Sequence, residues 1–411
     1  MHNPKFIASH RVDAKAFSRQ RVLTFPVLVA FLLCAFKGSL QALLDELFEA
    51  LTGENGRAVT KSGLSQARLK LKHSAFIALN DHLLPLLESH WPEPRWRSFR
   101  LVAADATVLR LPNNPRTQAE FGVQSDRHGQ SSVMARALGL YSTASGRMLK
   151  ANLSGYRGGE RELLLPLLPV LQPDDLLLLD RGFPSVWLFA LLQQQRRPFL
   201  ARIDGGQWAE VTAFAGSGLS DQVITRAVGR DTRRAARAVG VDNLPDTVTF
   251  RLIRVRLENG SEQILVTSLL DTENYPADDF AGLYHARWSI EEAFKCLKQR
   301  LTVEQFSGES PEAIRQDFYA KLLTANLAEA FAHSVQQTLP EHKAGRYQPN
   351  LTYTLARLRL RLFAWLLNPL GPDELSTLLD LIAKTLERKR PGRSAPRPKS
   401  RPNLKPRRQY K

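Results

Sequence analysis

Three acidic residues stand in sequence contexts that suit phosphate chemistry. Asp105 lies in a Val-, Leu- and Thr-rich segment that predicts a strand, and Asp180 follows four leucines that predict a buried strand. Glu291 lies in a segment with helical periodicity. Three carboxylates that converge repel one another unless cations neutralise them, and Mg²⁺ prefers oxygen ligands of this kind. Two such ions could clamp the attacking and leaving oxygens of an in-line phosphoryl displacement.

The position of Asp180 has two interpretations when it is taken alone. An aspartate at the carboxyl end of a buried strand either caps the turn that follows or binds a ligand. Ligand sites in open α/β sheets lie at that edge, so the second interpretation depends on whether other polar groups reach the same edge.

The predicted helix around Glu291 carries four polar side chains on one face. At 100° per residue, Tyr284, Arg287, Glu291 and Lys298 fall within a sector of about 60°. Arg287 is suited to fork onto a phosphate group beside the carboxylates. The alternative is an ordinary ion pair between Arg287 and Glu291, four residues apart on an exposed face. The residues expected to face the core instead are Ala286, Ile290, Ala293 and Leu297.

The segments that would position these residues alternate between strands and helices after residue 98. We expect strands over 101–111, 133–141, 147–153, 176–179 and 198–203, and helices over 160–171 and 184–195. This order predicts a mixed sheet in which three antiparallel strands precede the crossover helices.

Residues 205–280 have a different pattern. Two alternating segments, 247–257 and 263–269, flank a turn at Glu258-Asn259-Gly260, and glycine pairs interrupt the part before them, so we expect an all-β insertion. From residue 281 the pattern is helical again, with helices expected over 281–301, 311–338, 350–368 and 373–387.

Residues 1–97 read as helical, with expected helices over 27–36, 40–51 and 61–72, the last capped by Thr60. In that third helix Leu64, Ala67 and Leu71 share one face, and a polar face lies opposite. A short helix of this kind is typical of a helix-turn-helix DNA reader, although any surface helix looks similar. The polar face, our candidate DNA contact, consists of Lys61, Ser65, Arg68 and Lys72.

Composition narrows the classes of function. The 411 residues include 57 Lys and Arg against 40 Asp and Glu, and a net charge of +17 indicates a polyanionic partner, nucleic acid first. Two cysteines exclude a disulfide framework and a Cys-rich zinc module. The apolar run 22–36 is too short to span a membrane, so we expect no membrane partner and a cytoplasmic protein.

The segment 388–411 concentrates the charge. It holds eleven Lys or Arg, five prolines and no acid, so it cannot bury enough apolar surface to fold alone. We expect a basic disordered tail, either a solvated segment or an arm that binds DNA phosphates.

The spacing of the helical face resembles a known signature. Tyr284, Arg287, Glu291 and Lys298 are separated by two, three and six residues. This pattern resembles that of the bacterial cut-and-paste DDE transposases of insertion-sequence family four. Asp105-Ala106-Thr107 is similar to the first Asp motif of that family, with Ala where Gly is common, and Asp180-Arg181-Gly182-Phe183 is similar to its second.

The resemblance implies an α/β fold with an RNase H-like mixed-sheet core and a β-rich insertion, flanked by helical regions. The expected divisions are a helical DNA-binding domain (1–97), the core in two parts (98–204 and 281–309), the insertion (205–280), a C-terminal helical region (310–387) and the tail (388–411).

The resemblance also implies roles for the site residues. Asp105, Asp180 and Glu291 would be catalytic and would bind two Mg²⁺ ions, for which Mn²⁺ can substitute. Tyr284, Arg287 and Lys298 would contact phosphates next to the cleaved bond. The reaction implied is hydrolysis at transposon ends followed by attack of the 3′-hydroxyl on target DNA. The implied partners are double-stranded DNA and a second copy of the chain, in the bacterial cytoplasm at the nucleoid.

Other functions compete with this one. A transposase-derived DNA-binding protein that no longer cuts would not need three carboxylates and a full signature, and a helix-turn-helix regulator would leave residues 100–370 unexplained. An RNase H-like nuclease without strand transfer remains an alternative. Trp208, the only Trp of the insertion, could stack on a flipped base, but a core or hairpin role is the favoured interpretation.

Overall fold

The structure is a computed structural model that describes residues 1–19, 21–34, 39–53, 59–125, 129, 131–256, 260–368 and 371–389. The chain forms two compact units: residues 1–89, 110–133 and 295 onward form the first, and residues 90–109 and 134–294 the second. The limits of these two units do not coincide with the domain boundaries expected from the sequence. The expected tail from residue 390 and the turn residues Glu258 and Asn259 lie outside the described residues.

The first unit is mainly helical. Its helices are α1 (Pro4–His10), α2 (Phe25–Cys34), α3 (Leu40–Thr52), α4 (Lys61–Arg68), α5 (Ser74–His90), α6 (Pro115–Phe121), α13 (Pro311–Thr338), α14 (Glu341–Ala344), α15 (Leu351–Leu367) and α16 (Pro372–Ala383). Its short strands are β2 (Val123–Ser125), β10 (Tyr347–Pro349) and β11 (Leu386–Arg388). No helix among the described residues is long and apolar enough to cross a membrane.

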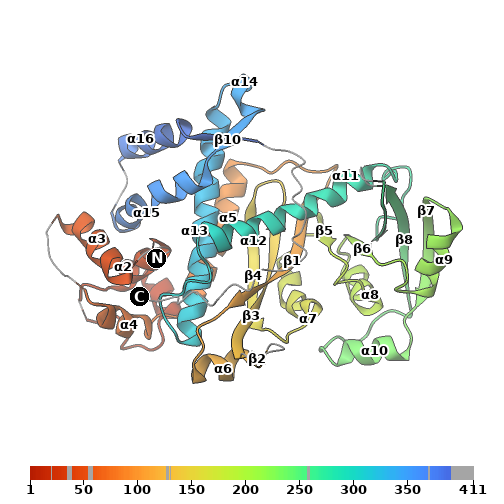
Figure 1. Cartoon of the computed structure of the whole chain (residues 1–411), viewed down its shortest axis with the longest axis horizontal. Coiled ribbons are helices and arrows are strands. Elements are labelled where there is room, and N and C mark those ends of the chain that lie inside the picture. The colour runs from red at the N-terminus through yellow and green to blue at the C-terminus, as the bar shows by residue number, and fades with distance from the viewer. Residues whose placement is uncertain are drawn as a thin grey trace. The chain divides into compact units, whose positions relative to one another are not determined.

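Helices from both ends of the chain share one hydrophobic core in this unit. Helix α2 is apolar on all sides, so it must be covered all round, and α13, α15 and α4 pack against it (Figure 1). Phe31 of α2, Leu323 of α13 and Phe363 of α15 belong to the same cluster. The N-terminal and C-terminal helical regions therefore share one compact unit and one hydrophobic core.

Two helices of the first unit end earlier than the sequence predicts. Helix α4 ends at Arg68, because Leu71 leaves the helix to form an isolated bridge with Arg11, and Lys72 therefore lies outside it. Helix α16 ends at Ala383, and the residues beyond it form β11, which pairs antiparallel with β10. In both places backbone pairing with a distant segment replaces further helical bonds.

The second unit is built on a mixed sheet. Its strands are β1 (Arg100–Arg110), β3 (Ser131–Ser142), β4 (Arg147–Gly155), β5 (Asp175–Leu179), β6 (Phe199–Ile203), β7 (Asp221–Ala227), β8 (Thr247–Arg256) and β9 (Glu262–Thr267). Its helices are α7 (Glu160–Leu164), the 3₁₀-helix η1 (Leu165–Val170), α8 (Val186–Gln194), α9 (Ala209–Ser217), α10 (Arg230–Arg237), α11 (Asp279–His285), the 3₁₀-turn η2 (Ala286–Trp288) and α12 (Ser289–Gln299). The first residues of β3 and the end of α12 continue into the other unit.

The strand order confirms the expected RNase H-like mixed sheet. The order is β3-β1-β5-β6-β9-β8-β7, with β4 on the outer side of β3 and β2 pairing with the first residues of β3 (Figure 1). Strand β4 runs antiparallel to β3, whereas β1, β5 and β6 run parallel to one another. Each parallel step is bridged by a helical segment: α7 and η1 precede β5, and α8 precedes β6.

Pro166 and Pro169 explain why the helix expected over 160–171 is not continuous. Each lacks a backbone N–H, so the segment after α7 tightens into the 3₁₀-helix η1.

The expected all-β insertion is corrected by the structure. Strands β7, β8 and β9 extend the central sheet in antiparallel order, but α9 and α10 are helices. Gly218, with φ of 73°, ends α9 in the left-handed conformation, so the glycines here terminate a helix. Trp208 precedes α9, is half-buried, and packs its ring against the buried Phe250, with centroids 5.4 Å apart.

Candidate active site

The two aspartates lie side by side on neighbouring strands. In the parallel pairing of β1 with β5, Ala104 is opposite Leu179, so Asp105 and Asp180 follow at the same level. All five residues of β5 are buried, and Asp180 is the first residue after them. Both carboxylates therefore meet at the carboxyl end of the parallel pair, where polar groups can reach a ligand.

Tyr284 lies on α11, the first of the helical elements that carry the signature residues, and connects it to this edge of the sheet. Its hydroxyl donates a hydrogen bond to the carbonyl oxygen of Leu179 at 3.2 Å and lies 3.4 Å from Oδ1 of Asp180. Burial raises the pKa of the phenol, so Tyr284 stays a neutral hydrogen-bond donor. The contact with Leu179 fixes α11 against the end of β5.

Arg287 joins the other two carboxylates. Its Nη2 lies 2.8 Å from Oε1 of Glu291, and its Nη1 lies 3.6 Å from Oδ2 of Asp105. The side chain is only 3% exposed, and its Nε and Nη1 have no hydrogen-bond acceptor. The predicted pair between Arg287 and Glu291 thus exists, but in a buried place and not on an exposed face.

A second arginine, which the sequence did not single out, contacts the site. Arg202 on β6 places Nη2 2.8 Å from Oδ1 of Asp180. The sequence feature that could have pointed to Arg202 is its place as a charged residue inside a short apolar strand, the one that follows the strand before Asp180. Two guanidinium groups therefore stand beside the three carboxylates of the site.

The two aspartates differ in their electrostatic surroundings. Burial raises the pKa of Asp105 to about 6, and the backbone N–H of Ala106 and the charge of Arg287 offset this only in part. Burial also acts on Asp180, but the charge of Arg287, the backbone N–H of Arg181 and the ion pair with Arg202 together lower its pKa. Of the two aspartates, Asp105 is thus the one whose burial is less fully offset by nearby charges and hydrogen bonds.

This difference predicts an effect of pH on stability. Because the folded-state pKa of Asp105 lies above its ordinary value of 3.8, its stabilising contribution is complete below pH 3.8 and is lost as pH rises through about 6. In metal-free buffer we expect Asp105→Asn to be more stable than the wild type at pH 8, by roughly 2–3 kcal/mol. Urea unfolding at pH 5 and pH 8 measures this, and equal pH dependence in the two proteins would contradict it.

The remaining predicted residues lie in the first unit. Lys298 lies on α12, two turns after Glu291. Lys61, Ser65 and Lys72 are exposed, which keeps them available as DNA contacts.

Arg68 is a correction, because it does not belong to an exposed face. It is 3% exposed and forms an ion pair with Asp317 of α13 at 2.8 Å. The early end of α4 and the buried acid on α13 draw this side chain into the core, so its role is structural.

The donor chemistry of the site suits a hard divalent cation. All three candidate ligands are carboxylates, which Mg²⁺ favours. As the side chains stand, no group of three or more His, Cys, Asp or Glu among the described residues is spaced to hold a metal ion. Arg287 instead reaches between Asp105 and Glu291 and supplies positive charge there. The three carboxylates could hold a divalent metal ion once the Arg287 guanidinium moves away from them and toward another anion.

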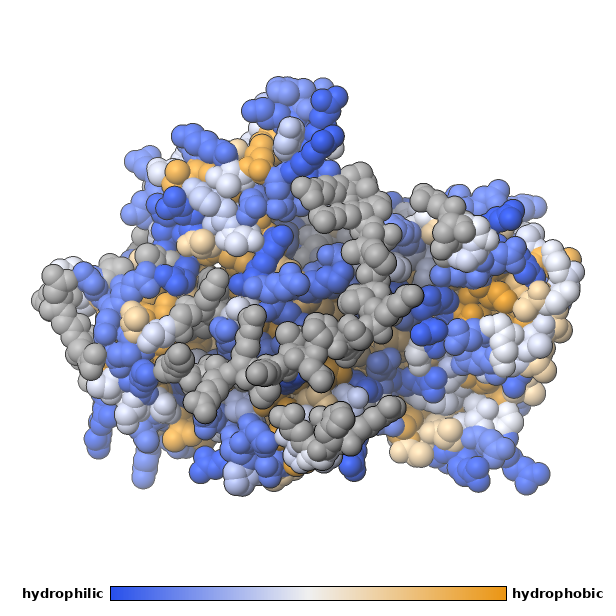
Figure 2. Space-filling model, viewed as in Figure 1, coloured by the Kyte–Doolittle hydropathy of each residue, from blue (hydrophilic) through white to orange (hydrophobic). Residues whose placement is uncertain are grey.

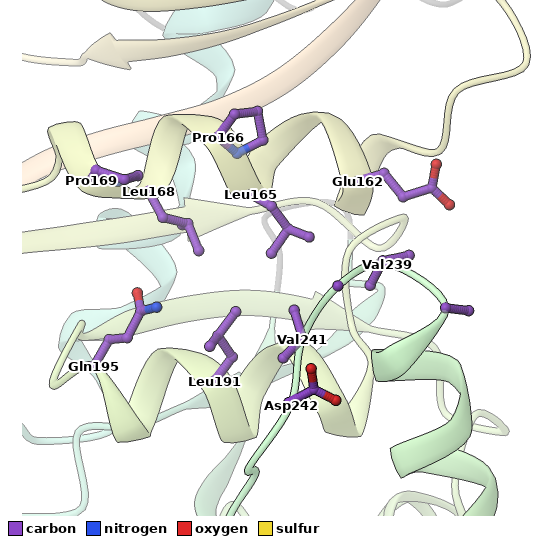
Figure 3. A pocket seen from close by; sticks show the side chains of 12 residues that line it. Glu162, Leu165, Pro166, Leu168, Pro169, Leu191, Gln195, Val239, Val241 and Asp242 are labelled. Atoms are coloured by element: carbon purple, nitrogen blue, oxygen red, sulfur yellow. The ribbon is translucent and has the colours of Figure 1, made fainter.

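The pocket of Figure 3 lies elsewhere in the second unit. It is an open cleft between η1, α8 and the loop after α10, where Leu165, Leu168, Leu191 and Val241 line the space (Figure 3). None of the residues that line it belongs to the carboxylate cluster, so we assign the chemistry to the cluster and not to the cleft.

Comparison with known proteins identifies the family to which the chain is similar. Residues 96–327 match the family model described as "Transposase DDE domain", a range that includes both aspartates and the whole signature. The chain is 25% identical to the transposase InsG for insertion sequence element IS4 of Escherichia coli (strain K12), over 71% of this chain and 65% of that relative's length. It is 35% identical to the putative transposase InsL for IS186A of the same organism, over 23% of this chain and 25% of the relative.

Solved structures also match the chain. One of them is a piggyBac transposase synaptic complex with hairpin DNA, matched with a TM-score of 0.44 and 12% identity over 95% of this chain and 84% of the other. The family match covers more than half of the chain, and the resemblance to insertion-sequence family four is confirmed. The chain belongs to the Transposase DDE domain family.

Proposed function

We propose that this protein is a cut-and-paste DNA transposase. It binds the inverted repeats at transposon ends, cleaves them by two-metal hydrolysis, and joins the freed 3′-hydroxyl to target DNA. The observation that carries the proposal is the meeting of Asp105 and Asp180, from paired parallel strands, with the Arg287–Glu291 pair of the signature helix. Its partners are double-stranded DNA and a second copy of the chain in the synaptic complex, in the bacterial cytoplasm at the nucleoid.

Asp105, Asp180 and Glu291 would hold two Mg²⁺ ions. Bound there, the ions supply charge neutralisation at the attacking and leaving oxygens of a phosphodiester. The low pKa of Asp180 keeps its carboxylate ionised and ready to bind a cation at neutral pH. The burial of the Asp105 carboxylate is less well compensated, so a neighbouring positive charge would stabilise its ionised form more than that of Asp180.

Arg287 has the properties of a phosphate-binding residue. Its buried Nε and Nη1 have no hydrogen-bond acceptor, and buried donors of this kind favour an added anionic oxygen. Tyr284 stays bonded to Leu179 and positions α11 and Arg287 beside the strand end. Arg202 holds the carboxylate of Asp180 in place from β6.

Strand-specific cleavage and joining of a labelled transposon-end duplex in Mg²⁺ tests this function. The duplex carries the inverted repeat that flanks the gene. We expect the wild type to nick the 3′ end and to join it to a supercoiled plasmid, and Asp180→Asn to lose at least 10³-fold in nicking while still binding the duplex.

Asp174→Asn is the matched control, because Asp174 precedes β5 in a half-exposed pair with Arg95 and is expected to leave nicking unchanged. Nicking without joining would identify a nuclease that lacks strand transfer. Specific binding without any cutting, in Mg²⁺ or Mn²⁺, would identify a DNA-binding protein derived from a transposase.

A further inference from the structure

Helix α10 in the insertion carries an arginine face that the site does not use. Its sequence, Arg-Asp-Thr-Arg-Arg-Ala-Ala-Arg, places Arg230, Arg234 and Arg237 at i, i+4 and i+7, which is one face of a helix. All three are exposed. Three guanidinium groups are thus aligned over about 10 Å of helix axis.

The fourth arginine of this helix fixes the helix in place. Arg233 donates hydrogen bonds to the carbonyl oxygens of Leu244 at 2.7 Å and Pro245 at 3.1 Å, and it pairs with Asp246 at 2.7 Å. Ala236 is fully buried, and α10 packs against α8. The exposed arginines therefore project from a helix held by its inner face, not from a loose loop.

Within the described part of the chain, two of the three exposed arginines lack the acidic partners that neighbouring arginines have, and the third has only a solvent-exposed one. Arg226, Arg233, Arg251 and Arg254 of the insertion each pair with a carboxylate. No such partner is found among the described residues for Arg230 or Arg237. Arg234 pairs only with Asp231 at 3.1 Å, and both side chains are more than four-fifths exposed, so solvent screens that pair.

The positive charge is local to α10. Residues 205–280 contain eight Arg, no Lys and eleven Asp or Glu, so the insertion as a whole is acidic. Four of those eight arginines fall within the eight residues of α10. Figure 2 shows hydrophilic residues at the lower right, over α10, with paler residues beside them. A concentrated cationic face on an otherwise acidic segment is not explained by folding or by general solubility.

We infer that the Arg230–Arg234–Arg237 face of α10 binds the sugar–phosphate backbone of duplex DNA. Duplex DNA offers about one negative charge per 1.7 Å of axis, which matches a row of closely spaced guanidinium groups. Arginine also forks onto phosphate oxygens, which lysine cannot do. The contact is sequence-independent and adds affinity without reading bases. The choice of DNA as the polyanion rests on the proposed function.

The test is the salt dependence of binding to a 40-base-pair duplex of unrelated sequence, compared between the full-length wild type and the triple variant R230Q/R234Q/R237Q. Each phosphate contact contributes about 0.9 to the slope of log K against log salt. We expect the slope to fall by about 2–3 and affinity at 0.1 M salt to fall by roughly 10²-fold or more. Circular dichroism and the thermal midpoint are expected to stay unchanged, since Gln is nearly as good a helix former as Arg.

Two matched variants sharpen the test. R230K/R234K/R237K keeps the charge and is expected to keep the slope within about 0.5, with weaker binding at each salt concentration. Arg233→Gln, on the inner side of the same helix, is expected to lose stability and to leave the slope unchanged. A triple Gln variant with the wild-type slope and affinity would overturn the inference.

The outcomes also separate this inference from the proposed function. A wild type that cleaves and joins ends, with a slope unaffected by the triple Gln change, refutes the role of α10 alone. A wild type that neither cleaves nor joins, with a slope that falls in the triple Gln variant, refutes the transposase proposal and leaves the DNA-binding face standing.

Discussion

Replacing Arg287 by methionine is expected to weaken both folding and cleavage. In metal-free buffer the variant leaves Asp105 and Glu291 in the site without their shared guanidinium. Removing one partner of a buried ion pair costs about 3–5 kcal/mol, and the carboxylates here are one-fifth exposed, so we expect the lower end, about 3 kcal/mol. Under the proposed function, nicking of the transposon end in saturating Mg²⁺ is expected to fall by about 10²–10³-fold, because the buried donor proposed to bind phosphate is lost.

The stability part is measured by urea unfolding with EDTA and again with Mg²⁺. We expect Mg²⁺ to stabilise Arg287→Met more than the wild type, because a bound cation replaces the missing charge. Arg202→Met is the control: its side chain is 26% exposed and pairs with Asp180, which is itself 27% exposed, so about 1 kcal/mol should be lost. An Arg287→Met protein with wild-type stability in EDTA and wild-type nicking would rule out the role given to this residue.

Replacing Arg68 by methionine is expected to cost about 3–5 kcal/mol of unfolding free energy. Its guanidinium pairs with Asp317 and donates to Gln316 at 2.9 Å and to the carbonyl oxygen of Ala313 at 2.8 Å. Asp317 is 3% exposed, so its charge would stay buried with fewer partners. The nearby Lys321 ammonium, whose pKa burial lowers to about 8, compensates incompletely. Urea unfolding of the full chain measures the loss.

Lys61→Met, on the same helix but exposed, is the control and is expected to change stability by less than about 0.5 kcal/mol. The double variant Arg68→Met/Asp317→Leu should recover part of the loss, because it removes the uncompensated charge. Weakened DNA binding by Arg68→Met at unchanged stability would instead restore Arg68 to the DNA-contacting face from which the structure removes it.

Local periodicity predicted most of the elements, but not where each one ends. The helix over 311–338 is confirmed to the residue, because Ser310 caps it and Pro311 opens it. The helix over 61–72 is four residues shorter, because its last residues pair with the segment near Arg11. Helices α9 and α10 were missed because they are short and follow glycines that resemble strand turns.

The sequence by itself determined which residues share a helix face and which strand ends carry an acid. Helical periodicity placed Tyr284, Arg287 and Glu291 on one face; the 3₁₀-turn η2 interrupts the expected helix 281–301 between α11 and α12, yet Arg287 still pairs with Glu291 four residues on. Asp180 follows β5 because four leucines must be buried. Only the tertiary structure decided which of these groups meet. The register of β1 with β5 aligned Asp105 with Asp180, and β6 brought Arg202 to the same point.

Arg68 shows the same difference between what the local sequence determines and what the tertiary structure determines. Its helix and its polar type are local properties, whereas its partner Asp317 lies 249 residues away. The periodicity of polar and apolar residues predicts the helix or strand face on which a side chain lies, because that face depends on the backbone angles of neighbouring residues. It does not record what that face meets, because contact depends on strand register and helix packing between segments that are distant in sequence.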